Sequence, residues 1–264
     1  MTDISKLAYV YDLNPRQGLG HFTRTNRLIK EFRRNGVECY LALEDKHRDF
    51  HEKIIREETP IYFKKTSKSF NLLVETLRIN EIHSVLIDSY TFGLKWEKYL
   101  SEKGFFIIAI DDHLKKHSAN MIFTNKPESQ RKFQNSKSQK WFMGPEFALL
   151  GQAKKRDVKK KKIISSILLH GGGSSLFNLM KNFTIETIEF AEKNLIDLSI
   201  VCTTKESQSY IKSLLSNKIW STKIKVLPFK KDLAKELQNY DVVAGPSGTT
   251  TFETILAGSF PFTF

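Results

Sequence analysis

The residues of this sequence best suited to bind an anion and to act as a base stand in a glycine turn near the N-terminus. Gly18 and Gly20 flank Leu19, and His21 and Arg24 follow them. An apolar run precedes the turn and an amphipathic stretch follows it, which predicts backbone N–H groups and a helix N-terminus facing a cleft where anions bind. Glycines let a ligand approach the backbone, and a neutral imidazole in the first helical turn could act as a base. The alternative is a tight turn with a solvated His and Arg.

Further polar side chains follow strand-like runs in the first half of the chain. Asp88 and Tyr90 follow one run, Asp111 follows a second and Asn125 a third. The carboxyl ends of the strands line the ligand crevice of an open parallel sheet, so we expect these groups on the side where His21 lies. Each of them could instead be a helix cap or a turn former.

Two turns in the second half have the size and composition of phosphate-binding turns. One contains Gly172 and Gly173 and precedes a helical stretch with Asn178 near its start. The other contains Ser247, Gly248, Thr249 and Thr250. Their N–H groups and hydroxyls suit a diphosphate. Glu253, in the helix that follows, could accept hydrogen bonds from sugar hydroxyls, or it could be the acid of a capping box.

Short β-rich runs alternate with stretches of helical periodicity along the chain. The expected strands of the first half are 7–11, 37–43, 61–63, 84–88, 105–110 and 121–123, with helices over 22–32 and 72–79. The expected strands of the second half are 163–169, 198–202, 224–227, 242–244 and 260–264, with a helix over 177–193. This alternation predicts an α/β protein with two doubly wound parallel sheets, each covered by helices.

A change in composition separates the two halves. A Gly/Pro stretch at 144–150 is followed by a lysine-rich run that ends at Lys162. We therefore expect an N-terminal Rossmann-like lobe at 1–150, a basic linker at 151–162 and a C-terminal Rossmann-like lobe at 163–264. We expect the lysines of 154–162 to be solvated and to take no part in catalysis.

The charge balance narrows the classes of partner. Lys and Arg number 42 and Asp and Glu 29, a formal net charge of +13, so an anionic ligand, nucleic acid or an acidic membrane surface must be considered. The basic residues are scattered, and their one dense cluster lacks interleaved aromatic residues, which does not favour nucleic acid.

Cysteine usage and hydropathy point to a soluble protein. Cys39 and Cys202 stand in apolar runs far apart in the sequence, as reduced core residues do. There is no zinc-ligand spacing, no N-terminal signal peptide, and no apolar run approaching the ~18 residues that span a bilayer. We expect a cytoplasmic monomer without metal or cofactor.

The order and spacing of these motifs resemble those of the PseG/SpsG-like UDP-sugar hydrolases of pseudaminic acid biosynthesis, relatives of MurG-type glycosyltransferases in the GT-B superfamily. The resemblance extends through nearly the whole chain. Its motifs are 18–21 with Arg24, Asp88 with Tyr90, 111–112 with His117, 144–150, 172–173 with Asn178, and 247–250 with Glu253. It implies a GT-B fold with an interlobe cleft, UDP on the C-terminal lobe and the sugar facing the N-terminal lobe. It also implies that His21 is the general base and that Asn178 and Glu253 bind the UDP-sugar.

The resemblance implies hydrolysis of a UDP-linked 2,4-diacetamido-2,4,6-trideoxy sugar to free sugar and UDP. His21 would take a proton from the attacking water, and the helix N-terminus at 247–250 would stabilise the charge on the departing UDP. A GT-B glycosyltransferase would use the same residues with an acceptor hydroxyl in place of water, and a nucleotide-sugar-binding protein without activity is the third candidate. Since this fold normally continues beyond such a last strand, the resemblance also predicts a truncated C-terminal lobe.

Overall fold

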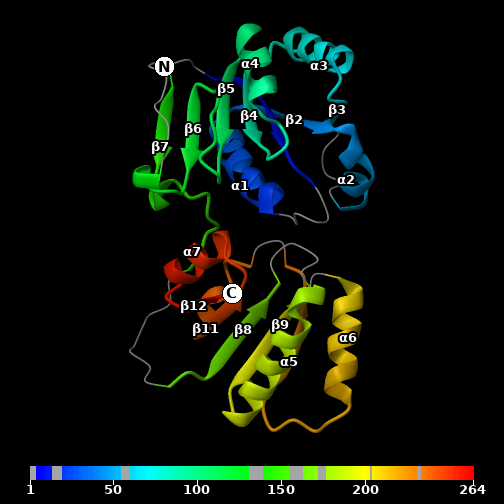
Figure 1. Ribbon diagram of the computed structural model, residues 1–264, viewed down its shortest axis with the longest axis vertical. Helices are drawn as coiled ribbons and strands as arrows, with labels where there is room; N and C mark the ends of the chain where they lie inside the picture. The colour runs from blue at the N-terminus through cyan, green and yellow to red at the C-terminus, as the bar shows by residue number, and fades with distance from the viewer. Residues whose placement is uncertain are drawn as a thin grey trace. The chain divides into compact units, whose positions relative to one another are not determined.

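The computed structural model describes residues 4–13, 20–54, 60–130, 139–154, 163–171, 177–202, 204–230 and 233–264. The chain divides into two compact units. Unit 1 consists of Met1–Asn14 and Arg24–Leu149, and unit 2 consists of Pro15–Thr23 and Leu150–Phe264. Each unit contains one parallel β-sheet with helices packed against it (Figure 1).

Unit 1 is built on a seven-stranded sheet in the order β3-β2-β1-β4-β5-β6-β7, with every pairing parallel. Its strands are β1 (Lys6–Tyr11), β2 (Glu38–Glu44), β3 (Ile61–Phe63), β4 (Ser84–Asp88), β5 (Phe106–Ile110), β6 (Met121–Thr124) and β7 (Lys140–Met143). The strand order reverses between β1 and β4, which are hydrogen-bonded neighbours. A ligand crevice is expected at the carboxyl ends of these two strands.

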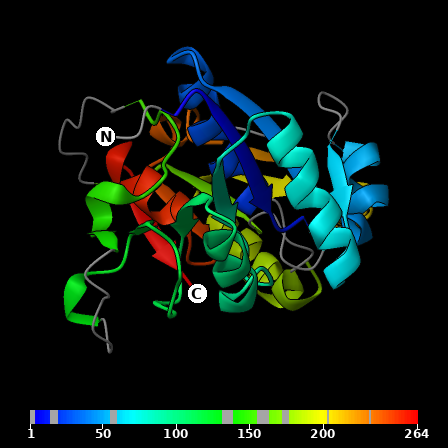
Figure 2. The same cartoon turned by 90° about the horizontal axis from the view of Figure 1, so that it is seen from above.

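Helices cover both faces of this sheet. They are α1 (Gly20–Arg34), which belongs to unit 1 from Arg24 onward, α2 (Arg48–Ile54), α3 (Ser67–Ile79) and α4 (Leu94–Glu102), with short 3₁₀ segments η1 (Asp45–His47), η2 (Glu128–Gln130) and η3 (Pro145–Phe147). Right-handed crossover connections that proceed in opposite directions along a parallel sheet place their helices on opposite faces. Because the strand order of this sheet reverses, helices cover both of its faces. Figures 1 and 2 agree in placing α2 and α3 at the β3 side of the sheet and β7 at the opposite side.

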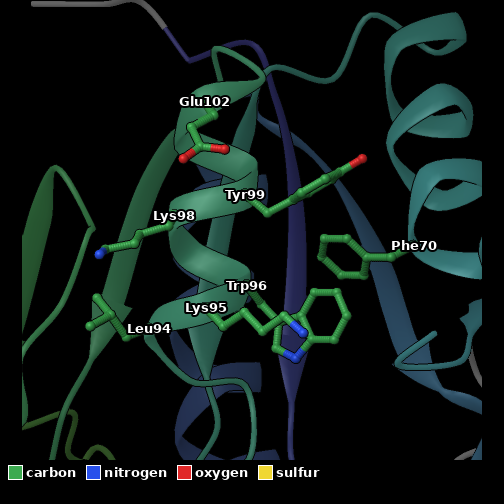
Figure 3. Close-up of a pocket in the computed structure, with 7 residues that line it drawn as sticks. All are labelled: Phe70, Leu94, Lys95, Trp96, Lys98, Tyr99 and Glu102. Carbon is green, nitrogen blue, oxygen red and sulfur yellow. The ribbon is translucent and has the colours of Figure 1, made fainter. Parts of the chain in front are cut away.

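The core of unit 1 follows the alternation of side chains along the strands. Ala8 and Val10 of β1 belong to a buried apolar cluster that includes residues of α3 and α4. Figure 3 shows Phe70 of α3 beside Trp96 and Tyr99 of α4, with ring centroids 4.4 and 5.4 Å from that of Phe70. These aromatic contacts hold the two helices together beside a hollow of about 500 Å³.

Unit 2 is built on a five-stranded parallel sheet in the order β10-β9-β8-β11-β12. Its strands are β8 (Ser166–His170), β9 (Asp197–Cys202), β10 (Ile224–Pro228), β11 (Val242–Gly245) and β12 (Phe260–Thr263). Its helices are α5 (Phe177–Lys193), α6 (Lys205–Ser216) and α7 (Thr249–Leu256), with the 3₁₀ segment η4 (Leu237–Asn239). The strand order reverses between β8 and β11.

Successive residues of β8 pack on opposite faces of the second sheet. Ile167 and Leu169 join the cluster that contains Ile188 of α5, whereas Leu168 joins a cluster with Leu237 and Ala257 at the other face. A strand segment buried on both faces is apolar, as residues 167–169 of β8 are. Among the helices that the structure describes, none is long and apolar enough to cross a membrane.

The two parallel, helix-covered sheets confirm the predicted fold class. Four elements, α2, α4, β7 and α6, have no counterpart among the expected ranges. In β7 no residue is fully buried, and α6 is mostly polar, so neither gives a strong hydrophobic pattern. The expected strand at 163–169 begins only at Ser166, where its pairing with Asp197 of β9 starts, and Ile163 and Ile164 are exposed.

Candidate functional site

The carboxyl ends of β1 and β4 in unit 1 are joined by a carboxylate. Asp12, directly after β1, accepts hydrogen bonds from Ser89 Oγ (2.7 Å), from Tyr90 N (2.7 Å) and from Thr91 N and Oγ1 (3.3 and 2.9 Å). Its side chain is buried. Asp12 therefore fixes the turn after β4 at the point where the strand order reverses, which positions Tyr90 at this edge of the sheet.

Arg24 links α1 to two carboxylates at the same edge. Its Nε donates to Asp88 Oδ2 (2.7 Å), Nη2 donates to Asp88 Oδ1, and Nη1 donates to both carboxylate oxygens of Asp112 (2.8 and 2.7 Å). Burial opposes the charge of Arg24, but Asp88 and Asp112 more than offset this and raise its pKa, so it stays cationic. The guanidinium organises this edge, and an anionic ligand would have to compete with two carboxylates for it.

Tyr90 presents an aromatic ring at this edge. Its hydroxyl donates to Asp112 Oδ2 (2.8 Å), and its ring centroid lies 4.7 Å from that of His113. Burial and the neighbouring Asp112 raise the pKa of Tyr90, so the phenol stays protonated. Because 36% of Tyr90 remains exposed, part of this residue is accessible to a ligand.

Asp111 and Asn125 stand after β5 and β6, as the sequence predicts for this edge. Asp111 is buried and accepts hydrogen bonds from the backbone N–H groups of His113 and Lys115, both at 2.8 Å. Asn125 Oδ1 is buried and has no hydrogen-bond partner within the part of the chain that the structure describes. A ligand N–H or O–H donor would satisfy it.

His21 is the second residue of α1 and is buried, with 4% of its surface exposed. Arg24, one turn further on, is buried as well. The alternative of a turn with a solvated His and Arg is therefore wrong. Gly20 is the first residue of α1 and is exposed, whereas Gly18 lies outside the described residues.

In unit 2 the strand-order reversal brings His170 against Gly245. His170 is the last residue of β8 and Gly245 the last of β11. A Cβ atom on Gly245 would lie 2.4 Å from His170 Nε2, so only glycine leaves room for the ring. Burial lowers the pKa of His170 to about 4, and the imidazole is neutral at physiological pH. Sequence reasoning did not select His170, although a His that ends an apolar strand before a glycine turn is the signal for it.

We expect Gly245→Ala to destabilise unit 2 by about 1–3 kcal/mol, because the new methyl group must displace a buried ring. His170→Ala removes the obstacle, so the double variant should lose less stability than the two single variants together. Denaturant unfolding followed by Trp220 fluorescence, with Trp96 and Trp141 replaced by Phe, measures this difference. Losses that add within about 0.5 kcal/mol would contradict the packing of this pair.

The helix α7 begins directly after β11 and offers an accessible N-terminus. Ser247 and Gly248 are exposed, and Thr249 and Thr250 form its first, partly exposed turn. The Gly248 N–H reaches Thr251 Oγ1 at 3.4 Å, so Thr251 takes the capping position N3. The N-terminal N–H groups and hydroxyls of this helix are suited to a phosphate group.

Glu253 lies inside α7 and is buried. Because Thr251 is the N3 residue, Glu253 is not the acid of a capping box. Its Oε1 accepts a hydrogen bond from the backbone N–H of Gly151 (2.8 Å), a residue 102 positions earlier in the chain. Glu253 thus ties α7 to the segment that enters unit 2. Gly172, Gly173 and the side chain of Asn178, also expected in this region, lie outside the described residues.

No protein-family model matches the sequence, and no curated protein matches it either. Solved structures do match the fold. MurG from Acinetobacter baumannii has a TM-score of 0.63 and 16% identity, with 96% of this chain and 76% of that chain covered. The UDP-GlcNAc 2-epimerase from Neisseria meningitidis, bound to UDP-GlcNAc, has a TM-score of 0.62 and 13% identity, with 98% and 82% covered.

The spinosyn rhamnosyltransferase SpnG, complexed with thymidine diphosphate, has a TM-score of 0.59 and 11% identity, with 98% of this chain and 80% of that chain covered. This chain has the GT-B fold. Two parallel sheets of seven and five strands match these structures, as the sequence predicts. At such identities the likeness establishes the GT-B architecture, and one such architecture can host different chemistries.

Proposed function

We propose that this GT-B chain is a nucleotide-sugar hydrolase that cleaves a UDP-linked 2,4-diacetamido-2,4,6-trideoxy sugar into free sugar and UDP. The observation that carries the proposal is that, in each unit, polar groups gather where the strand order reverses. In unit 1 these are Asp12 and Tyr90, and in unit 2 they are His170 and the start of α7. Ligands of open α/β sheets bind at such reversals.

The nucleotide half of the proposal is supported by the start of α7 and by the structural neighbours. Ser247 precedes α7 and is exposed, and Thr249 in the first turn is partly exposed, so their hydroxyls lie near the N-terminal N–H groups of the helix. The epimerase from Neisseria meningitidis was crystallised with UDP-GlcNAc, and the rhamnosyltransferase with a nucleoside diphosphate. We assign the diphosphate to the start of α7 and the ribose hydroxyls to Glu253.

The sugar half is supported by two residues of unit 1. Tyr90 offers a partly exposed ring, and Asn125 Oδ1 is a buried acceptor that lacks a donor among the described residues. An acetamido N–H is a donor of the kind that Asn125 requires. Arg24 and Asp111, also predicted to bind substrate, act in this proposal by holding the surrounding loops.

The proposed step is a displacement at the anomeric carbon. The water oxygen forms a bond to that carbon while an O–H proton passes to an imidazole nitrogen of His21. The bond between the anomeric carbon and the diphosphate oxygen breaks, and UDP leaves with the electron pair. Helical N–H groups at 247–250 stabilise the charge that develops on UDP.

The experiment that tests this function measures UDP release from a panel of UDP-sugars, with and without candidate acceptors. Release of free sugar and UDP from the diacetamido sugar without an acceptor is the expected result. Release that requires an acceptor would identify a glycosyltransferase, and conversion to an isomeric UDP-sugar, seen by NMR, would identify an epimerase. Tight UDP binding without turnover of any UDP-sugar would indicate a nucleotide-sugar-binding protein without activity.

A further inference from the structure

His117 of unit 1, whose side chain is 10% exposed, lies between two carboxylates. His117 Nδ1 lies 2.8 Å from Glu97 Oε1, and its Nε2 lies 3.3 Å from Asp111 Oδ2. Glu97 comes from α4 and is 1% exposed. Its second oxygen accepts the N–H of Ser118 at 2.7 Å. Nε2 has no hydrogen-bond partner among the described residues, so its contact to Asp111 is a charge attraction, whereas Nδ1 is within hydrogen-bond distance of Glu97. A cationic imidazolium ring is attracted to both carboxylates.

Asp111 shapes the loop that begins with it. Its two oxygens accept the N–H groups of His113 and Lys115, both at 2.8 Å. Between them, Leu114 has a positive φ of 52°, a left-handed conformation that is unfavourable for a leucine. Such strain persists only where the surrounding contacts fix the backbone. Asp111 supplies these contacts directly, and His117 holds Asp111.

The residues of this loop surround the ring of Tyr90. Asp112 accepts the hydroxyl of Tyr90, His113 lies against its ring, and Lys115 Nζ is 5.6 Å from the ring centroid. The same Asp112 accepts two hydrogen bonds from Arg24. The position of the loop therefore decides the shape of the surface around Tyr90.

We propose that His117 is a positioning residue that, through Asp111, fixes the loop 111–118 and with it the sugar-facing surface around Tyr90. The inference rests on the proposed function, in which Tyr90 faces the sugar. His117 touches no substrate in this arrangement. It acts from beneath the site, by holding the carboxylate that shapes the loop.

The protonation of His117 gives this role a pH dependence. Burial lowers the pKa of His117, but the nearby carboxylates of Asp111 and Glu97 outweigh it and raise the pKa to about 9. The ring of Trp141, 5.9 Å away on β7, adds no charge. The ring is therefore cationic at neutral pH and attracts both carboxylates, and this attraction is lost as the pH rises through about 9. We expect kcat/KM to fall over this range.

The test compares His117→Gln with His83→Gln, an exposed histidine before β4, as a matched control. In His117→Gln we expect KM for the UDP-sugar to rise about tenfold, the Kd of UDP to stay within about twofold, and the alkaline limb near pH 9 to disappear. Hydrogen exchange of the His113 and Lys115 amides should accelerate at least about tenfold in the free protein. The control should leave all four quantities unchanged.

A second variant, Glu97→Gln, keeps an oxygen that accepts His117 Nδ1–H but removes a negative charge. Since the loss of a nearby anion lowers the pKa of His117, the alkaline limb should move to lower pH. Unchanged exchange of the two amides in a folded His117→Gln chain, or an unchanged limb in Glu97→Gln, would overturn the proposal. If the wild-type chain hydrolyses no UDP-sugar, the proposed function fails, while the exchange measurement still decides whether His117 holds the loop.

Discussion

Replacing His21 by Asn is expected to lower kcat for UDP-sugar hydrolysis by about 10²–10⁴-fold, the usual contribution of a general base. Asn has a similar size and remains polar, so the buried start of α1 should keep its fold. Because the base acts on water and not on the nucleotide, the Kd of UDP should change by less than about tenfold. Steady-state kinetics and calorimetry with UDP measure the two quantities.

His83→Asn is the matched control for this experiment. His83 is exposed and directly precedes β4, at the amino end of the strand, whereas the proposed site lies at the carboxyl ends. Its turnover should equal that of the wild type. A His21→Asn chain with near-wild-type turnover would remove His21 from the mechanism, and loss of UDP binding in step with turnover would indicate a structural role.

Replacing Glu253 by Ala is expected to weaken UDP binding by about 1.5–3 kcal/mol, or about 10–150-fold in Kd, the range for hydrogen bonds to a charged group. The same change leaves the N–H of Gly151 without its acceptor, so stability falls as well. Glu253→Gln separates the two effects, because the amide oxygen can still accept from Gly151 while the charge is lost.

Calorimetry with UDP and thermal unfolding of both Glu253 variants measure binding and stability side by side. Glu206→Ala, an exposed acid in the first turn of α6, serves as the control and should change neither. We expect Glu253→Gln to keep most of the stability and to lose UDP affinity. Unchanged affinity in a folded Glu253→Gln chain would leave Glu253 with the purely structural role that its contact to Gly151 describes.

The sequence by itself determined the elements whose signal is local. Runs with an apolar centre, such as 84–88 and 242–244, predict buried strands because a parallel sheet covered on both faces requires the centres of its strands to be apolar. Glycine and Ser/Thr turns predict helix starts, and α1 and α7 begin at Gly20 and Thr249. The placement of Asp88 and Asp111 at strand ends also follows from the pattern, because the end of an apolar run is visible in the sequence.

Tertiary structure alone decided which of these groups meet. Arg24 pairs with Asp88, 64 positions away, and with Asp112, 88 positions away, because β1, β4 and β5 are consecutive in the sheet. Glu253 contacts Gly151, 102 positions earlier, because the fold places α7 beside the segment that contains Gly151. Hydrophobic periodicity reports the face on which a residue lies, but it contains no information on strand order. Ion pairs and hydrogen bonds between distant residues depend on that order, so they emerge only when the sheet is assembled.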